Sequence, residues 1–93
     1  MPTLFDPFSL KGVTLRNRIV VAPMCQYSAV DGLTNQWHRV HYPAMARGGA
    51  GLVIVEATAV SPDGRITQGC TGLWDDSQID GMARIAADIT AEG

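Results

Sequence analysis

The sequence predicts an α/β fold with parallel strands. Two short apolar runs, residues 19–22 and 52–55, are each followed by a segment in which apolar side chains recur at helical spacing. A glycine-containing turn between two short apolar stretches precedes them and predicts a hairpin at residues 8–15. Because strands alternate with helices, we expect a parallel sheet with right-handed crossovers.

The composition is that of an ordinary globular chain. Of the 93 residues, 46% are hydrophobic and 17% are charged, and the net charge is −2. No basic patch indicates a nucleic-acid partner, and no apolar run reaches the roughly 20 residues of a membrane helix. The first residues lack the features of a signal peptide. Cys25 and Cys70 make no disulfide framework, so we expect a reduced, cytoplasmic setting.

The hairpin and the first strand follow from local residue types. Gly12 supplies the positive φ that a tight hairpin turn requires. Residues 19–22 form a short, largely β-branched run, which is typical of a strand buried on both faces. Pro23 ends this strand, because proline has no N–H for the ladder of the sheet.

A long loop and a helix come next. Residues 24–35 are expected to form the loop, and loops of this length are often functional. Residues 36–47 predict a helix that Thr34 or Asn35 caps, with Pro43 expected to weaken or kink it. The apolar side of this helix is formed by Trp37, Val40, His41, Ala44 and Met45.

The second strand and second helix repeat the pattern. Gly48 and Gly49 end the first helix, and a buried strand is expected over residues 50–59. Ser77, with Asp80 three residues later, resembles a capping box for the second helix. The apolar stripe of that helix is formed by Ile79, Met82, Ala83, Ala86 and Ile89.

The loop after the first strand carries the most suggestive chemistry. In parallel α/β folds, ligands bind at the carboxyl ends of strands. Pro23, Met24, Cys25 and Tyr27 offer a rigid ring, a thioether, a thiol and a phenol, which together could contact one flat ligand. The alternative is a packed strand end in which Cys25 is a small buried hydrophobe, and local chemistry alone favours that alternative.

Several segments resemble the beginning of an Old Yellow Enzyme. They are residues 4–7 (LFDP), 15–18 (LRNR), 22–27 (APMCQY), 48–51 (GGAG) and 56–58 (EAT). Each motif is weak by itself, but their order and spacing are specific and cover essentially the whole chain. Cys25 with Tyr27 resembles the bacterial, thermophilic-like branch, which includes the xenobiotic reductases.

The resemblance implies a fold and an activity. Residues 1–93 would be the N-terminal part of a single FMN-binding (β/α)8 TIM-barrel domain: a hairpin, then the first two βα units of an incomplete barrel, with no second domain. The parent would be a homo-oligomeric ene-reductase. It would use NADPH or NADH and FMN to reduce the C=C bond of an α,β-unsaturated carbonyl compound.

The alternative is that the chain is a non-catalytic fragment, or one half of a split enzyme that needs a complementing chain. A free-standing βαβ module that binds a small ligand is a third and weaker reading. It would require the chain to be stable without partner strands.

The resemblance also implies roles for five residues. Pro23 and Met24 match positions that touch the flavin ring, and Cys25 matches a thiol near its reactive edge that tunes the redox potential. Ala57 matches a backbone contact to the polar edge of the flavin. Tyr27 matches a phenol on the substrate side. The catalytic residues of the family lie downstream of position 93, so none is expected within this chain.

Other polar residues have simpler interpretations. His38 and His41 lie on the first predicted helix, where we expect them to have packing or helix-capping roles. The histidines, the cysteines and Glu56 match no compact zinc spacing, so no metal is expected. Glu56 lies inside an apolar run. We expect it to pair with an arginine, either Arg16, Arg18 or one outside the chain, although a catalytic role remains the alternative.

Overall fold

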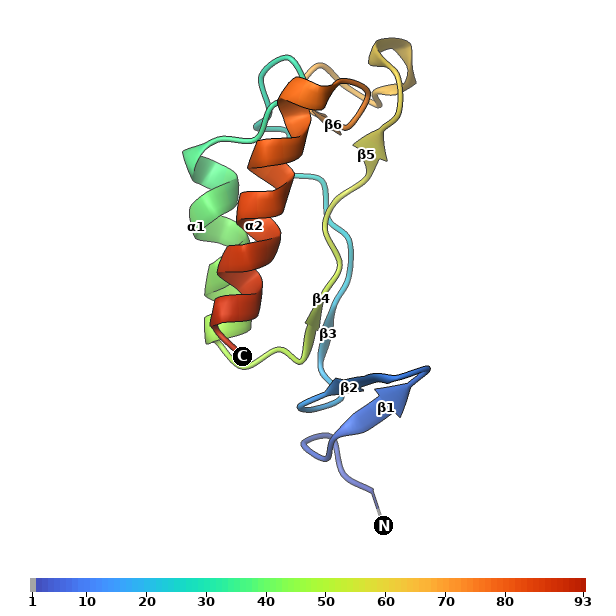
Figure 1. Cartoon of the computed structure of the whole chain (residues 1–93), viewed down its shortest axis with the longest axis vertical. Helices are drawn as coiled ribbons and strands as arrows, with labels where there is room; N and C mark the ends of the chain where they lie inside the picture. Colours follow the sequence, from blue (N-terminus) through green and yellow to red (C-terminus); the bar gives the residue numbers. More distant parts are fainter. Residues whose placement is uncertain (1) are drawn as a thin grey trace.

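The computed structural model describes residues 2–93 and contains strands, helices and short turns of 3-10 helix. The strands are β1 (Phe8–Leu10), β2 (Val13–Leu15), β3 (Val20–Val21), β4 (Leu52–Val53), β5 (Thr58–Ala59) and β6 (Thr71–Gly72). The helices are α1 (Gln36–Arg47) and α2 (Ile79–Ala91), and the 3-10 turns are Pro62–Gly64 and Asp76–Gln78. Figure 1 shows the two helices side by side along one flank of β3 and β4, with the hairpin at the N-terminal end.

The hairpin has the turn that the sequence predicts. β1 and β2 pair antiparallel, with Phe8 opposite Leu15. Lys11 and Gly12, the two residues between the strands, have φ values of 47° and 87°. Two consecutive positive φ angles are the signature of the type I′ turn, which matches the twist of the flanking strands.

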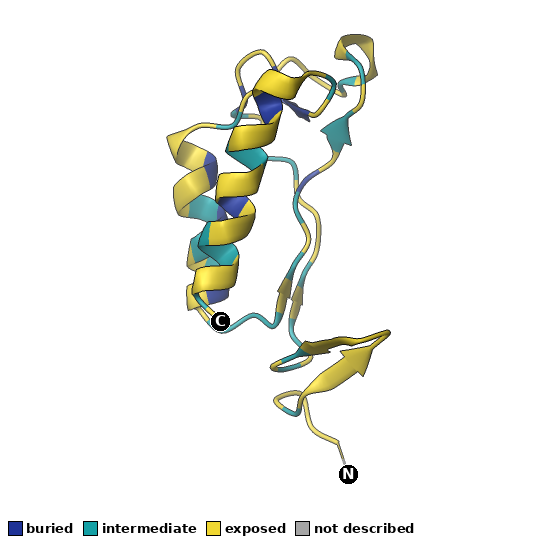
Figure 2. Ribbon diagram, in the orientation of Figure 1, coloured by how far each residue is buried: buried dark blue, intermediate teal, exposed yellow. Residues whose placement is uncertain are grey.

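β3 and β4 form the expected parallel pair, with Val20 opposite Leu52 and Val21 opposite Val53. Both are shorter than predicted, because regular pairing stops just before Pro23. The prediction that the first strand is buried on both faces is wrong for the described residues. Val20 is 47% exposed, because β3 pairs only with β4 and the helices cover only one flank of the pair (Figure 2).

α1 has the predicted bounds, and Asn35 is its N-cap. Gly48 caps its C-terminus and Gly49 has a φ of 119°, which confirms the predicted helix end. The predicted apolar side, however, is not the buried one. It lines an open groove of about 350 Å³, whereas the buried residues of α1 are His38, Tyr42 and Ala46. The helix packs through its more polar side because that side faces Glu56 and the end of β4.

α2 begins at Ile79, as its periodicity predicts, but the capping residues differ from those predicted. The capping box is formed by Asp75 and Gln78 around the preceding 3-10 turn, not by Ser77 and Asp80. The Asp75 carboxylate accepts from the N–H of Ser77 at 3.0 Å. This box starts the helical segment two residues earlier than expected.

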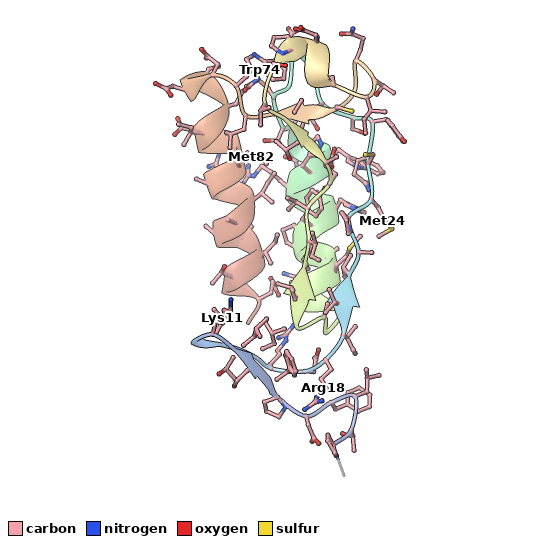
Figure 3. The ribbon with its side chains drawn as sticks, turned by 90° about the vertical axis from the view of Figure 1, so that its right-hand side faces the viewer. Lys11, Arg18, Met24, Trp74 and Met82 are labelled. Carbon is pink, nitrogen blue, oxygen red and sulfur yellow. The ribbon has the colours of Figure 1, made fainter. Side chains whose placement is uncertain are left out.

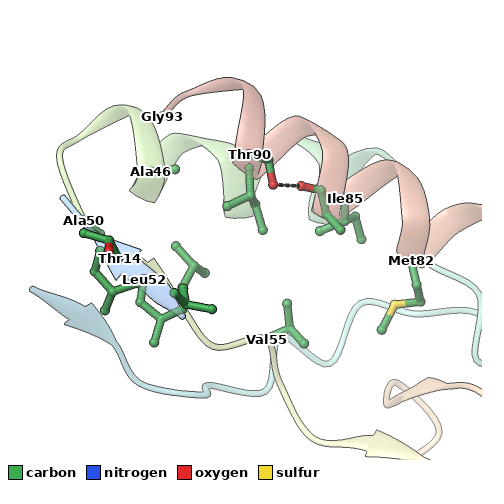
Figure 4. Close-up of a pocket in the computed structure, with 15 residues that line it drawn as sticks. Thr14, Ala46, Ala50, Leu52, Val55, Met82, Ile85, Thr90 and Gly93 are labelled. Carbon is green, nitrogen blue, oxygen red and sulfur yellow. Dashed lines mark hydrogen bonds between the residues drawn. The ribbon is translucent and has the colours of Figure 1, made fainter. Parts of the chain in front are cut away.

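An apolar groove of about 560 Å³ separates α2 from β4 and the hairpin (Figure 4). Its walls include Leu52, Val55, Met82 and Ile85. The radius of gyration is 14.4 Å, against about 12 Å for a compact domain of this length. Residues 2–93 therefore leave much apolar surface uncovered. Within them, neither helix has the length and hydropathy needed to cross a bilayer.

Candidate functional site

The candidate site lies where β3 and β4 end. Because the strands are parallel, their carboxyl ends reach the same edge of the sheet. The loop that starts at Ala22 leaves β3 there, and residues 54–57 leave β4 beside it (Figure 1). All five residues that the resemblance singles out belong to these two segments. This edge is where parallel α/β folds bind ligands.

Most of these residues are accessible to a ligand. Met24 is 48% exposed and Tyr27 is 60% exposed, Pro23 and Ala57 are also exposed, and Cys25 is half-buried. Figure 3 shows Met24 projecting from the loop on the side away from the helices. The arrangement presents an apolar, sulfur-containing surface on which a flat ring could pack.

The loop after β3 is braced by polar contacts. The Trp37 indole N–H donates to Gln26 Oε1 at 3.0 Å, which ties the loop to the first turn of α1. Gln26 Nε2 donates to the carbonyl of Met24 at 2.9 Å, and the Ser28 hydroxyl donates to the carbonyl of Gln26 at 2.9 Å. Tyr27 has a φ of 54°, in the left-handed region that few non-glycine residues adopt. The loop therefore has a defined shape.

Several backbone donors of the described chain are free at this edge, including those of Cys25 and Val55. Among residues 2–93, no hydrogen bond uses the N–H of Met24 or of Ala57. The carbonyl of Ala57, in contrast, accepts from the Thr71 hydroxyl at 3.3 Å. A ring with polar atoms on its edge would satisfy such donors, so the residues present fit a ligand of the flavin type.

Glu56 is buried, at 3% exposure, but its partner is not an arginine of this chain. The Tyr42 hydroxyl donates to Glu56 Oε2. Arg16 instead donates to the carbonyl oxygens of Ala46 and Ala50. Arg18 lies over the ring of Phe8. The expectation that Arg16 or Arg18 pairs with Glu56 is therefore wrong, because both guanidinium groups bind groups near the hairpin and the end of α1.

Tyr42 was missed by the sequence interpretation, although a signal for it exists. It follows His38 by four residues and therefore shares a helical face with it. Burial raises the pKa of Tyr42 above its usual range, and the hydrogen bond to Glu56 adds to that shift. The phenol is therefore a donor at neutral pH, as the hydrogen bond to Glu56 requires.

The histidines have structural roles, as expected. His38 is fully buried, and its Nδ1 accepts from the N–H of Asn35 at 3.1 Å, which completes the capping of α1. The ring of His41 stacks on Trp37 with centroids 6.1 Å apart. Within residues 2–93, no three histidine, cysteine or acidic side chains gather as metal ligands would.

Comparison with known proteins gives consistent matches. Residues 3–93 match the model of the NADH:flavin oxidoreductase / NADH oxidase family. Over 92 residues, the chain is 52% identical to an NADPH dehydrogenase of Bacillus licheniformis and 48% identical to one of Geobacillus thermodenitrificans. Each match covers 97% of this chain and 27% of the relative. The chain thus spans about a quarter of the length of these curated relatives.

Solved structures give the same result. Morphinone reductase in complex with tetrahydroNAD matches with a TM-score of 0.89 and 32% identity, over 100% of this chain and 25% of that one. The Old Yellow Enzyme homologue NCR from Zymomonas mobilis matches with a TM-score of 0.87 and 31% identity. That match covers 99% of this chain and 26% of the other.

Proposed function

This chain belongs to the NADH:flavin oxidoreductase / NADH oxidase family, that of the Old Yellow Enzymes, and on that premise we propose that it forms one wall of an FMN site. The whole protein would be an NAD(P)H-dependent oxidoreductase. The observation that carries the proposal is the edge shared by β3 and β4. There, exposed side chains stand next to the free N–H groups of Met24 and Ala57.

Each residue at this edge has a role in the proposal. Bound FMN would supply hydride transfer from the nicotinamide to the substrate. Pro23 and Met24 would pack against the ring, and the N–H of Ala57 would donate to its polar edge. The thiol of Cys25 would lie beside the reactive part of the ring and tune its potential.

For the substrate, we propose an α,β-unsaturated carbonyl compound whose C=C bond is reduced. Tyr27 would line the substrate side of the ring, which its exposed phenol, held on the braced loop, permits. Polarisation of the carbonyl and delivery of the single proton to the α-carbon would fall to residues outside this chain.

The proposed fold of the whole protein is a (β/α)8 barrel in one domain, of which residues 1–93 supply the hairpin and the first two βα units. The next strand would lie along the apolar groove between β4 and α2. Two features support this: the apolar walls of that groove and the quarter of the relatives' length that the chain spans.

We also propose a cytoplasmic location. The free thiols of Cys25 and Cys70 support it, because such thiols persist in a reducing compartment.

The test uses the complete protein, meaning the polypeptide in which this chain is joined to the rest of the proposed barrel. The complete protein is incubated with FMN, desalted and examined by visible absorption, and NADPH consumption is then followed with and without an α,β-unsaturated ketone. We expect a retained flavin band, shifted from that of free FMN, and faster NADPH consumption with the ketone. A colourless protein would overturn the FMN site. Flavin reduction without ketone turnover would overturn the ene-reductase activity alone.

A further inference from the structure

The backbone between β4 and β5 is not part of a paired strand. The last hydrogen bond of the β3–β4 ladder runs from the N–H of Ile54 to the carbonyl of Val21, at 3.0 Å. Pro23 cannot extend this ladder, because it has no N–H. Pairing resumes only at Thr58, opposite Thr71. Residues 55–57, which include the proposed flavin contact Ala57, are therefore held by side chains. The Thr71 hydroxyl donates to the carbonyl of Ala57 at 3.3 Å, and the Thr58 hydroxyl donates to the carbonyl of Glu56 at 3.0 Å.

The side chain of Tyr42, on α1, binds the N–H of Glu56 in this stretch. The Tyr42 hydroxyl accepts from the N–H of Glu56 at 3.1 Å and donates to Oε2 of the same residue. A single phenol thus binds both the main chain and the side chain of Glu56. Tyr42 and Glu56 are each 3% exposed, so water does not compete for these bonds. We call this pair of bonds the Tyr42–Glu56 clamp.

His38 lies close to the carboxylate of the clamp. Because its Nδ1 accepts from Asn35, the neutral ring carries its proton on Nε2. That nitrogen is 3.9 Å from Glu56 Oε2, which is too far for a hydrogen bond but close enough for electrostatic attraction. Neither His38 Nε2 nor Glu56 Oε1 has a hydrogen-bond partner among residues 2–93. The carboxylate is thus held by α1 alone within the described chain.

We propose that Tyr42 and Glu56 are positioning residues for the flavin: the clamp fixes the N–H of Ala57, and the carboxylate adds a buried negative charge next to that contact. This inference rests on the proposed function, in which Ala57 binds FMN. Glu56 and Ala57 are consecutive, so displacing one moves the other. A buried charge acts strongly on neighbouring charges, because the protein interior screens it less than water does.

Two substitutions in the complete protein separate positioning from charge. Tyr42→Phe keeps the ring but removes the hydroxyl and therefore both bonds of the clamp. We expect the dissociation constant of FMN, measured by fluorescence titration, to rise about tenfold, as the loss of a buried hydrogen bond to a charged group allows. Glu56→Gln keeps the side-chain volume and an oxygen that can accept from Tyr42, so this variant should fold even if Tyr42→Phe does not.

Glu56→Gln tests the charge. A carboxylate disfavours the additional electrons of the reduced flavin, so its replacement should move the flavin midpoint potential in the positive direction. The matched control is Asp88→Asn, which removes a carboxylate on α2 whose Oδ2 lies 3.7 Å from Arg39 Nε. The control should leave both the FMN affinity and the potential unchanged.

The outcomes are distinct. If the unsubstituted protein retains no FMN, the proposed function fails and this inference fails with it. If the protein retains FMN, but both variants bind it equally well at an unchanged potential, only the inference is overturned. A lower melting temperature without a change in FMN affinity or potential would then show that the Tyr42–Glu56 clamp is purely structural. A weaker FMN affinity with Tyr42→Phe, together with a positive shift in Glu56→Gln, would support it.

Discussion

The thiol of Cys25 is half-buried in the loop after β3. It lies between Met24, which is exposed, and Gln26, whose side chain accepts a hydrogen bond from Trp37. In the complete protein we expect Cys25→Ala to shift the flavin midpoint potential while FMN remains bound. A polarisable thiol beside the ring changes the stability of the electron-rich reduced form, whereas the backbone contacts that hold the ring stay in place. A redox titration measures the shift. Cys70→Ala, which alters the other free cysteine, is the control, and an unchanged midpoint for Cys25→Ala would refute the role.

His38 gives a prediction about pH. Burial lowers the pKa of His38 below 6.5, against an opposing effect of Glu56. Between that lowered value and about 6.5, the unfolded chain binds more protons than the folded one, so acid favours unfolding. We expect stability to fall as pH drops below about 6.5, and to fall less steeply in His38→Gln. Urea unfolding at several pH values gives the free energy of unfolding as a function of pH. The same pH dependence in both proteins would count against the prediction.

At the residue scale, the sequence identifies the loop but not the clamp. Pro23, Met24 and Cys25 form a contiguous motif, and the motif can be recognised without knowing what packs on it. The partner of Glu56 depends on which face α1 turns inward, and the apolar stripe pointed to the wrong face. A packing or capping role is expected for His38, but nothing in the sequence shows that it and Tyr42 lie against a buried carboxylate.

The geometry of the loop after β3 depends on the N-terminal end of α1. Asn35 Oδ1 accepts from the N–H of Trp37 at 3.0 Å, and its Nδ2 donates to the carbonyl of Ser28 at 2.6 Å. We expect Asn35→Ala to lower the free energy of unfolding by about 1 kcal/mol, the usual cost of losing an N-cap. Urea unfolding of the complete protein measures it. Gln36→Ala, at the exposed first position of the helix, should change stability much less.

Predictability also differs between elements. The hairpin turn and the bounds of α1 follow from local chemistry, because Gly12 and Asn35 act within a few residues of themselves. The end of β4 does not, because the apolar run continues past Val53 while its strand partner stops before Pro23. β6 was missed altogether: Thr71 and Gly72 form a strand only because β5 lies beside them.

For the molecule as a whole, the uncovered groove predicts how the 93-residue chain behaves alone. We expect the chain to show no NADPH-driven reduction of enones above that of free FMN. We also expect it to associate, because the walls of the groove and the outer edges of β3 and β4 would meet water. Size-exclusion chromatography and a turnover assay test both statements. A cooperative, monomeric unfolding transition would favour an autonomous module instead.

The clamp and the β3–β4 ladder together fix the number of residues between Ile54 and Glu56. The ladder fixes Ile54 through Val21, and Tyr42 fixes Glu56, so one residue spans the interval between two anchored positions. Deleting Val55, or inserting a residue next to it, would leave the chain unable to satisfy both anchors at once. Either Ile54 would leave the sheet, or a different residue would meet the phenol and carry Ala57 out of place. This stretch therefore tolerates substitution more readily than any change in its number of residues.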